Sequence, residues 1–409
     1  MKRAVVTGMG VISPVGNDVK TFWDNIVNAR HGIGPITKFD ATDYKAKLAA
    51  EVKDFNARAY MEKTDVMRSD LYAQYALAAA GMAVNESGVV GTVDPERFGV
   101  YFGSGIGGIG TFQREMDKLR NEGPKKVSPF FIPMLISNMA AGAVAIRFNC
   151  KGPAMPSVTA CASGANAIGE ALRSIRHGYA DAIITGGAEA AVTELGMAGF
   201  INMQALSVAQ DPSAASLPFD RRRAGFVIGE GAGALVLEEY EHAKARGAKI
   251  FGEVAGYGSS CDAYHITAPI PGGAGGARAM REAMREAGYS ENESIYINAH
   301  GTGTPLNDAA ETLAIKNAFG EKKAKKIRIS STKAVTGHML GAAGAAEAIV
   351  CLLALGEGII PPTANLSEPD GDCDLDYVPI KAVIEKADAA LSNSFGFGGH
   401  NACLAFRRI

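Results

Sequence analysis

Three side chains suited to acyl transfer stand in stretches built from small residues. Cys161 lies in VTACASGANAIGEAL, where a glycine- and alanine-rich segment is expected to begin a helix. His300 follows SIYINA and precedes GTGTP, and His338 lies in STKAVTGHMLGAAG. A thiol attacks as its thiolate, and the free N–H groups at the start of a helix lower its pKa, so we expect Cys161 to be ionised and reachable. One cysteine with two histidines predicts thiol-based acyl transfer.

Each of these residues also has an ordinary structural interpretation. A free cysteine is most often a small, inert core residue, and the five other cysteines of the chain fit that description. A single histidine is likewise more often structural than catalytic. The catalytic interpretation is favoured because all three residues stand at expected strand-to-helix junctions, where side chains project into a crevice at the end of a sheet.

Two glycine-rich stretches have the composition of binding loops. LSNSFGFGGHNACLAF alternates Phe395 and Phe397 with glycines, which predicts a compact loop whose backbone N–H groups hold an oxyanion. A plain turn before the last strand is the alternative. YFGSGIGGIG looks like a dinucleotide fingerprint, but it lacks the helix start and the later acidic residue of a βαβ unit, so we exclude that function.

Short apolar runs alternate with alanine-rich stretches of helical period along the chain. RAVVTGMG, DAIITGGA and AGALVLEEY are typical of strands, and residues 70–84 and 277–287 of helices. This order predicts an α/β fold. A strand, a polar loop and a small-residue helix recur around Cys161 and His338, so we expect two similar halves that share one site. A charged helix gives way to a strand in EHAKARGAKIFGEVAG, which predicts halves of 1–250 and 251–409.

Composition excludes several classes of protein. The 409 residues are 47% hydrophobic, and 41 Lys plus Arg balance 43 Asp plus Glu, so we expect a large core and neither a nucleic acid nor a membrane as partner. Six cysteines without C-x-x-C or zinc spacing predict free thiols and a cytoplasmic location. The first apolar run breaks at Thr7, and AIVCLLAL is shorter than a membrane span, so neither export nor insertion is expected.

The sequence resembles the β-ketoacyl-[acyl-carrier-protein] synthases of the condensing-enzyme family, most closely the bacterial synthase II group. TACASG, NAHGTGTPLND, STKAVTGHMLGAAG and NSFGFGGHN occur in the family's order, and PFDRRRAGFVIGEGAG resembles its characteristic loop. The match covers essentially the whole chain. It implies a thiolase-like fold, with two similar halves in alternating α-β-α-β-α layers, and normally a homodimer.

The resemblance also implies a reaction and its residues. An acyl group carried on Cys161 condenses with malonyl-acyl-carrier protein, giving 3-oxoacyl-acyl-carrier protein, CO2 and free carrier in fatty acid elongation. The N–H groups of Cys161 and Phe397 would hold the oxyanion, while His300 and His338 would stabilise the enolate. Lys333 would orient its surroundings near His338, the alternative being a solvated surface lysine.

Binding roles follow from the same resemblance. The resemblance implies that Phe395 belongs to the pantetheine and acyl site. It implies that Phe397, besides its oxyanion role, is a gate between the entry of the acyl and the malonyl substrate. The phosphopantetheine arm would meet Thr302 and Thr304, and Ile106 would bound the acyl pocket. No cofactor is expected, apart from a structural monovalent cation near four residues: Asn298, Glu347, Ser392 and Asn393. Acyl-carrier proteins are acidic, so docking is expected at four basic residues, unless these form a solvated face: Lys63, Arg68, Lys125 and Lys126.

Other functions remain open at this point. A thiolase would need a second catalytic cysteine in the C-terminal loop, where none occurs before Cys403. A non-catalytic chain-length factor would lack the nucleophile, which argues against that binding subunit. A ketosynthase of a specialised polyketide or polyene pathway would share these motifs. The chain departs from the family pattern at two positions: Ala224 replaces the usual Asp of the family loop, and Gln204 replaces a common Arg. These departures affect the expected loop contacts and the affinity for the carrier, and they leave the expected chemistry unchanged.

Overall fold

The strands repeat one topology twice. The computed structural model describes residues 1–409. In the first half, the order across the sheet is β5-β4-β6-β7-β1. These strands are β1 Ala4–Ile12, β4 Phe98–Gly103, β5 Ala154–Ser157, β6 Ala182–Glu189 and β7 Gly231–Glu239. If these five strands are numbered by their order along the chain, they lie across the sheet in the order third, second, fourth, fifth and first.

The second half has the same order and the same strand directions. Its strands run β10-β9-β13-β14-β8 across the sheet. They are β8 Gly252–Cys261, β9 Ile295–Asn298, β10 Arg328–Ser330, β13 Ala389–Gly396 and β14 His400–Arg407. In both halves the last strand is antiparallel to its two neighbours, and the second, third and fourth strands are parallel. The predicted internal duplication is therefore present in the topology.

The two half-sheets are joined by one short contact. Val5 pairs with Glu253 and Val6 with Gly252, antiparallel, which makes a single ten-stranded sheet. The division of the chain into domains at residue 250 stays a prediction.

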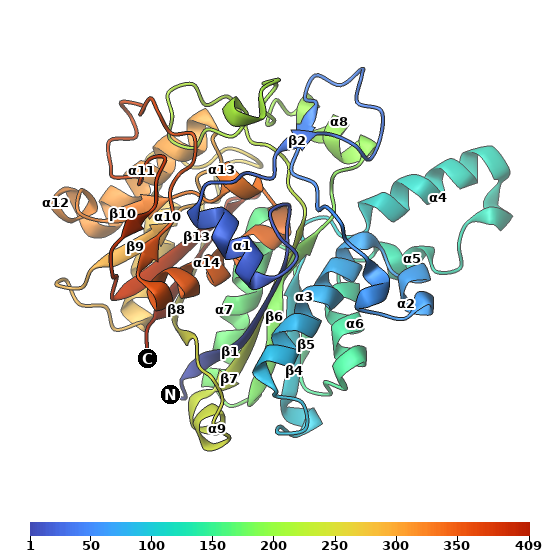
Figure 1. Ribbon diagram of the computed structural model, residues 1–409, viewed down its shortest axis with the longest axis horizontal. Helices are drawn as coiled ribbons and strands as arrows, with labels where there is room; N and C mark the ends of the chain where they lie inside the picture. The colour runs from blue at the N-terminus through green and yellow to red at the C-terminus, as the bar shows by residue number, and fades with distance from the viewer.

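Helices complete five layers, as Figure 1 shows. The half-sheets face each other across two buried helices, α7 Ser163–Arg176 and α14 Ala343–Glu357, each of which contacts strands of both halves. The outer face of the first half is covered by α3 Leu71–Ser87 and α6 Met139–Phe148, and that of the second by α10 Ala274–Glu286, which packs with α11 Pro305–Phe319. The predicted α-β-α-β-α layers are confirmed.

Small residues bring the central helices together. A Cβ on Gly164 of α7 would lie 2.8 Å from the carbonyl oxygen of Gly341, and one on Gly344 of α14 would lie 2.8 Å from the backbone nitrogen of Ala165. Only residues without large side chains allow the two helices to approach so closely.

The run AIVCLLAL belongs to a longer apolar segment than the sequence suggested. Leu340–Glu357 could cross a membrane by length and composition alone, but 83% of it is buried between the half-sheets, which accounts for its apolar character.

Shorter elements surround this frame. The long predicted helices are found at shifted ends, 71–87 instead of 70–84 and 274–286 instead of 277–287. Helix α4 projects away from the body of the molecule (Figure 1). The remaining elements are α1 Val19–Val27, β2 Gly34–Pro35, β3 Leu48–Ala49, α2 Lys63–Met67, α4 Ile109–Glu122, α5 Phe131–Leu135, α8 Glu194–Asn202, α9 Tyr240–Ala245, α12 Glu321–Ala324, α13 Lys333–Thr336, β11 Ile359–Ile360, β12 Val383–Ile384, and the 3-10 turns η1 Ala57–Ala59, η2 Pro95–Arg97, η3 Pro124–Lys126, η4 Ala160–Ala162, η5 Pro212–Ala214 and η6 Leu340–Ala342.

Candidate active site

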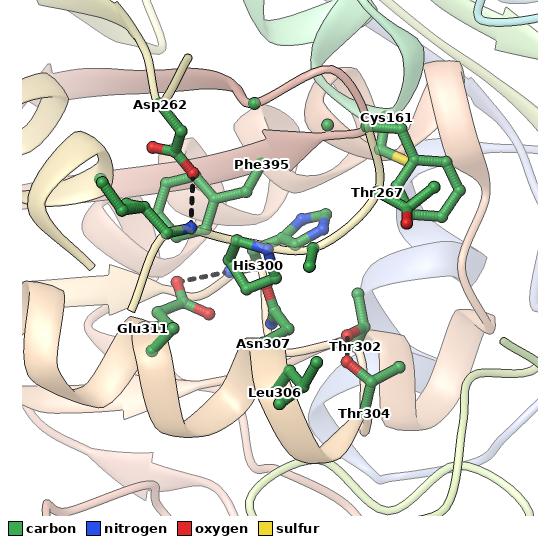
Figure 2. A pocket seen from close by; sticks show the side chains of 18 of the residues that line it. Cys161, Asp262, Thr267, His300, Thr302, Thr304, Leu306, Asn307, Glu311 and Phe395 are labelled. Atoms are coloured by element: carbon green, nitrogen blue, oxygen red, sulfur yellow. Dashed lines mark hydrogen bonds between the residues drawn. The ribbon is translucent and has the colours of Figure 1, made fainter. Parts of the chain in front are cut away.

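One cavity collects the three residues that the sequence singled out. Its volume is about 720 Å3, and Cys161, His300 and His338 all line it. Cys161 comes from η4, directly before the central helix α7, while His300 follows β9 and His338 lies between α13 and η6. Figure 2 shows Cys161 and His300 in this cavity. The duplicated topology therefore brings both histidines of the second half to the thiol of the first.

The thiol stands on a strained turn at the start of α7. Ala160, the residue before it, has a φ of 50°, a left-handed conformation that side chains rarely adopt. Cys161 is only 7% exposed, and burial raises its pKa to about 12, with the charge of Lys333 acting in the opposite direction. The prediction of an ionised thiol was therefore wrong for the resting protein, because loss of solvation outweighs the helix terminus.

Two backbone N–H groups reach the sulfur. Those of Cys161 itself and of Phe397 donate hydrogen bonds to it, which favour its charged form. Phe397 directly follows β13, and Gly396 at the end of that strand leaves the space needed. A Cβ on Gly396 would lie 2.5 Å from the carbonyl oxygen of Thr159 and 3.3 Å from the nitrogen of Cys161. The glycine loop thus places two convergent donors at the sulfur, the arrangement that an oxyanion requires.

The two imidazoles are close together and neutral. The ring centroids of His300 and His338 are 5.3 Å apart, with planes at 83°. Burial lowers the pKa of both far below the usual range, and the charge of Lys333 lowers it further. The Nδ1 atom of each ring has no hydrogen-bond partner.

A buried carboxylate holds the backbone at His300. The N–H groups of His300 and Gly301 donate to Glu311 Oε1 and Oε2, at 2.8 and 2.7 Å, and the Asn393 amide donates to Oε1 at 3.1 Å. Figure 2 shows Glu311 facing His300 from α11. Burial raises the pKa of Glu311 to about 7. Glu311 was not predicted from the sequence, where its only signal is an acid on the buried face of the helix after GTGTP.

His338 is held by the glycine-rich loop of the first half. Its N–H donates to the carbonyl of Val227 at 2.7 Å, and its own carbonyl accepts from the N–H of Gly229 at 2.8 Å. The ring packs edge-on against Phe226, with centroids 5.1 Å apart. The stretch AGFVIGEG therefore acts as a backbone support for the second histidine. Neither Phe226 nor this support was anticipated from the sequence.

Lys333 is buried beneath the site. Its side chain is 1% exposed, and Nζ donates to Glu347 Oε1 at 2.5 Å. The alternative of a solvated surface lysine was therefore wrong. Lys333 begins α13 and Glu347 lies on α14, so the pair joins the two segments that flank His338.

Most predicted binding residues line the same cavity. Thr302 and Thr304 do so with hydroxyls 2.9 Å apart, and Phe395 packs against His300 at 5.7 Å between ring centroids. Figure 2 shows both threonines together on one side of the cavity. Ile106, by contrast, is not in the lining and lies 36% exposed on the loop after β4.

Comparison with known proteins agrees with this geometry. The model of the beta-ketoacyl synthase N-terminal domain matches residues 1–243, and that of the C-terminal domain matches residues 251–367. The chain belongs to the beta-ketoacyl synthase family.

Named relatives of this ketosynthase are similar over their whole length. The 3-oxoacyl-[acyl-carrier-protein] synthase 2 of Synechocystis sp. is 50% identical, covering 100% of this chain and 98% of its own. A beta-ketoacyl synthase from Burkholderia phymatum has a TM-score of 0.93 at 35% identity, covering 100% of both chains. A ketosynthase bound to a hexaketide, in complex with its type II polyketide synthase acyl-carrier protein, gives 0.91 at 35% identity and covers 100% of this chain and 99% of its own. The thiolase-like ketosynthase fold is thereby established, and Cys403, fully buried in β14, is in no position to be a second catalytic cysteine.

All four predicted cation ligands carry buried side-chain oxygens without hydrogen-bond partners. These oxygens are Asn298 Oδ1, Glu347 Oε2, Ser392 Oγ and Asn393 Oδ1, and Asn298 and Ser392 are direct neighbours across β9 and β13. Such an oxygen set suits a hard cation. The amide nitrogen of Asn393 donates to Glu311, on the face of β13 opposite to that of Ser392. The four residues stay a prediction as cation ligands.

The four basic residues lie on the surface of this ketosynthase. Lys63 begins α2 and Arg68 follows it, while Lys125 and Lys126 belong to η3, and all four are exposed. The guanidinium of Arg68 stacks over the ring of Phe130 at 4.9 Å, which brings α2 next to the segment between η3 and α5. The two predicted basic pairs thus occur on neighbouring surface segments.

Proposed function

We propose that this protein is a 3-oxoacyl-[acyl-carrier-protein] synthase that condenses an acyl group with malonyl-acyl-carrier protein in fatty acid elongation. One observation carries the proposal: a thiol with two N–H donors and two neutral imidazoles line the same cavity. A nucleophile and separate donors for a second negative charge are what the two half-reactions require. The relative of that name is 50% identical over the whole chain.

The first half-reaction transfers the acyl group to the enzyme. The Cys161 sulfur attacks the thioester carbonyl carbon of acyl-acyl-carrier protein, a new S–C bond forms, and the carrier's S–C bond breaks. Negative charge develops on the carbonyl oxygen, where the N–H groups of Cys161 and Phe397 stabilise it. Because burial keeps the resting thiol protonated, its proton leaves during attack and ends on the departing carrier thiol.

The second half-reaction forms the carbon–carbon bond. Malonyl-acyl-carrier protein loses CO2, and the electron pair of the broken C–C bond moves into the thioester as an enolate. Neutral His300 and His338 donate N–H to that oxygen, a task for which imidazoles with lowered pKa are suited. The enolate carbon attacks the acyl carbonyl on Cys161, the S–C bond breaks, and the sulfur leaves as a thiolate that takes up a proton from water. The product is 3-oxoacyl-acyl-carrier protein.

Substrate binding and accessory groups complete the proposal. The phosphopantetheine arm lies in the cavity beside the hydroxyls of Thr302 and Thr304. Thiol and imidazole chemistry needs no organic cofactor. A monovalent cation at Asn298, Glu347, Ser392 and Asn393 would have a structural role, and a Tm that is higher in potassium chloride than in choline chloride at equal ionic strength would support it.

The proposed partners are an acidic acyl-carrier protein and a second copy of the chain. The carrier is supported by the exposed basic residues at α2 and η3 and by the ketosynthase neighbour that binds its own carrier. A homodimer is supported by the exposed edge strand β5 with Met155, Val158 and Ile146 exposed in and around it. Six free cysteines favour the cytoplasm.

Substitution of the nucleophile tests the function directly. We expect Cys161→Ala to abolish acylation by acyl-acyl-carrier protein and condensation, while Cys261→Ala, at an exposed cysteine outside the cavity, leaves both intact. Acylation is read as the mass of the acyl-enzyme and condensation as the 3-oxoacyl product. Condensation that survives in Cys161→Ala would refute the proposed nucleophile.

The histidines need a separate assay of malonyl-acyl-carrier protein decarboxylation. We expect His300→Ala and His338→Ala to lower that rate about 100- to 1000-fold, the loss typical of one oxyanion donor, with some acylation of Cys161 retained. An unchanged rate in either variant would remove that residue from the mechanism. The same products separate the alternatives: saturated primers extended by two carbons support fatty acid elongation, and repeated extension without reduction supports a polyketide or polyene pathway.

A further inference from the structure

A buried side chain closes the turn that carries Cys161. Ser163 Oγ accepts the N–H of Thr159 at 2.9 Å and donates to the carbonyl oxygen of Ala160 at 2.7 Å. Ser163 is fully buried. Ala160, the strained residue of the turn with its φ of 50°, lies inside the loop that these two bonds close. A residue in such a conformation persists only where its surroundings hold it, so the bonds of this turn bear on the position of the thiol.

The start of the turn is also fastened to the central helix α7. Asn166 Nδ2 donates to Thr159 Oγ1 at 2.6 Å. Asn166 stands three residues after Ser163 on α7, a spacing that places both side chains on one face of the helix. Thr159 is therefore held through its backbone N–H by Ser163 and through its hydroxyl by Asn166.

The second half of the fold fixes the orientation of Asn166. The hydroxyl of Tyr257, on β8, donates to Asn166 Oδ1 at 2.7 Å. A carboxamide carries its acceptor and its donors on different atoms, so an oxygen directed at Tyr257 leaves the nitrogen directed at Thr159. A chain of three side chains thus runs from β8 across the central helix to the turn of the nucleophile.

Tyr257 has little freedom to move. The residue is 1% exposed, and a Cβ on Gly169 would lie 2.3 Å from its ring, so the ring lies directly against the backbone of α7. The guanidinium of Arg173 lies over the same ring, 4.5 Å from its centroid. The N–H of Tyr257 donates to Glu286 Oε2 at 3.2 Å. Contacts on both the ring and the backbone therefore make Tyr257 a fixed end for the chain.

The turn also meets the loop that supplies the second oxyanion donor. A Cβ on Gly396 would lie 2.5 Å from the carbonyl oxygen of Thr159, and Phe397 is the next residue after Gly396. A shift of Thr159 therefore changes the position of the Cys161 N–H relative to that of the Phe397 N–H. Two donors stabilise an oxyanion only while both are aimed at the place where its charge develops.

We propose that Tyr257 and Asn166 are positioning residues for acyl transfer: the hydrogen-bond chain from Tyr257 through Asn166 to Thr159 sets the turn of the nucleophile against the Phe397 loop. This inference deepens the proposed function and rests on it. Neither residue lines the cavity, so both act on the reaction only through the turn. His300 and His338 lie on other segments, so the chain bears on acylation of Cys161 and not on malonyl decarboxylation.

Removal of a single oxygen tests the chain in the full-length protein. We expect Tyr257→Phe to lower kcat/KM for acylation by acyl-acyl-carrier protein about three- to tenfold, the factor to which the net contribution of one hydrogen bond corresponds. The rate of malonyl-acyl-carrier protein decarboxylation should stay at the wild-type value. The matched control is Tyr377→Phe, which removes another buried hydroxyl, bonded to Thr312, and should leave both rates intact. An equal fall of both rates in Tyr257→Phe would show a general disturbance of the fold and would overturn the positioning role.

A double-mutant cycle tests whether the residues act as one chain. Thr159→Val removes the hydroxyl that accepts from Asn166 and keeps the shape of the side chain, so we expect a similar, selective fall of acylation. Tyr257 and Thr159 share the partner Asn166, and residues in one hydrogen-bond network are not additive. The two changes together should therefore lower kcat/KM for acylation by less than the product of the single losses. Losses that multiply would show independent effects and would refute the chain.

The remaining outcomes separate this inference from the proposed function. A wild-type protein that forms no acyl-enzyme at Cys161 refutes the proposed function, whereas an acylating wild type and full acylation in a folded Tyr257→Phe protein refute the inference alone. Ser163→Ala covers the case in which Tyr257→Phe or Thr159→Val does not fold. It removes both bonds across the turn, so acylation should fall further than in Tyr257→Phe while decarboxylation is retained. Unchanged acylation in a folded Ser163→Ala protein would overturn the role assigned to this turn.

Discussion

Lys333 and Glu347 form an ion pair of 2.5 Å in which the side chains are 1% and 4% exposed. The charge of Lys333 lowers the pKa of both His300 and His338, the two imidazoles of the cavity. Glu347 balances that charge without contacting the rings. Lys333 therefore supplies a positive charge near the site where the proposed enolate forms, and loss of either partner would leave the other as an unpaired buried charge.

Replacing Lys333 with methionine leaves the Glu347 carboxylate buried without its cation. We expect Lys333→Met to lose about 3–5 kcal/mol of unfolding free energy, the usual effect of removing one partner of a buried pair. Burial already raises the pKa of Glu347, and the variant lacks the charge that opposes this rise. A carboxyl whose pKa is raised on folding stabilises the fold at low pH and loses that contribution as the pH rises. Urea unfolding should therefore show a larger deficit at pH 8 than at pH 5.

The double variant is the control for this reading. Glu347→Gln added to Lys333→Met removes the stranded charge, so we expect part of the lost stability to return and the pH dependence to flatten. A deficit of equal size at both pH values would contradict the assignment of the loss to an unpaired carboxylate.

The resting state of Cys161 predicts an unusual pH profile for alkylation. Burial raises the pKa of the thiol to about 12, and only the thiolate reacts. The rate of carbamidomethylation by iodoacetamide should therefore rise about tenfold per pH unit from pH 7 to 10, without a plateau. Peptide mass spectrometry separates Cys161 from the exposed Cys261, and Cys261→Ser removes the competing site. A rate at Cys161 that is constant above pH 7 would show a pre-formed thiolate instead.

The sequence predicted the parts of this structure that repeat or that carry a motif. Alternating strands and helices gave the α/β fold, and the recurrence around Cys161 and His338 predicted two similar halves, which the strand order confirms. Residues expected in the cavity at motif positions, such as Thr302 and Phe395, do line it.

What the sequence could not supply depends on burial and on contacts distant in the chain. The helix start suggested a thiolate at Cys161, but the loss of solvation that reverses this is a property of the packed fold. Glu311 looks like an ordinary acidic residue in the sequence, because a carboxylate that accepts hydrogen bonds from backbone N–H groups leaves no spacing pattern.

Gly396 is expected to tolerate no side chain. A Cβ there would lie 2.5 Å from the Thr159 carbonyl oxygen, so either the Cys161 turn or Phe397 must shift. The N–H groups of Cys161 and Phe397 would then no longer point at the same oxygen atom. We expect Gly396→Ala to lower kcat for acylation about 100- to 1000-fold, as loss of one such donor does. Gly356→Ala is the control, since a Cβ at that position of α14 meets open space. Equal activity of the two variants would argue against the proposed oxyanion site.

Carrier docking makes a prediction about charge rather than about chemistry. Lys125→Glu with Lys126→Glu replaces attraction to an acidic carrier by repulsion. Each exposed ion pair is worth about 0.2–1 kcal/mol, so we expect KM for acyl-acyl-carrier protein to rise about tenfold at low salt, and the difference to shrink as salt screens it. Steady-state kinetics at two ionic strengths measure both effects.

The matched control reverses two exposed lysines elsewhere, Lys322 and Lys325 at α12, on the opposite side of the molecule from α2 and α5 (Figure 1). It should leave KM for the carrier unchanged if the basic residues at η3 act locally. A short acyl thioester of N-acetylcysteamine has no carrier to dock, so its KM should be the same in all these variants. A rise of KM for that small substrate, or an equal rise in the control variant, would mean that the charge reversal disturbs the fold or the overall field and that η3 is not where the carrier binds.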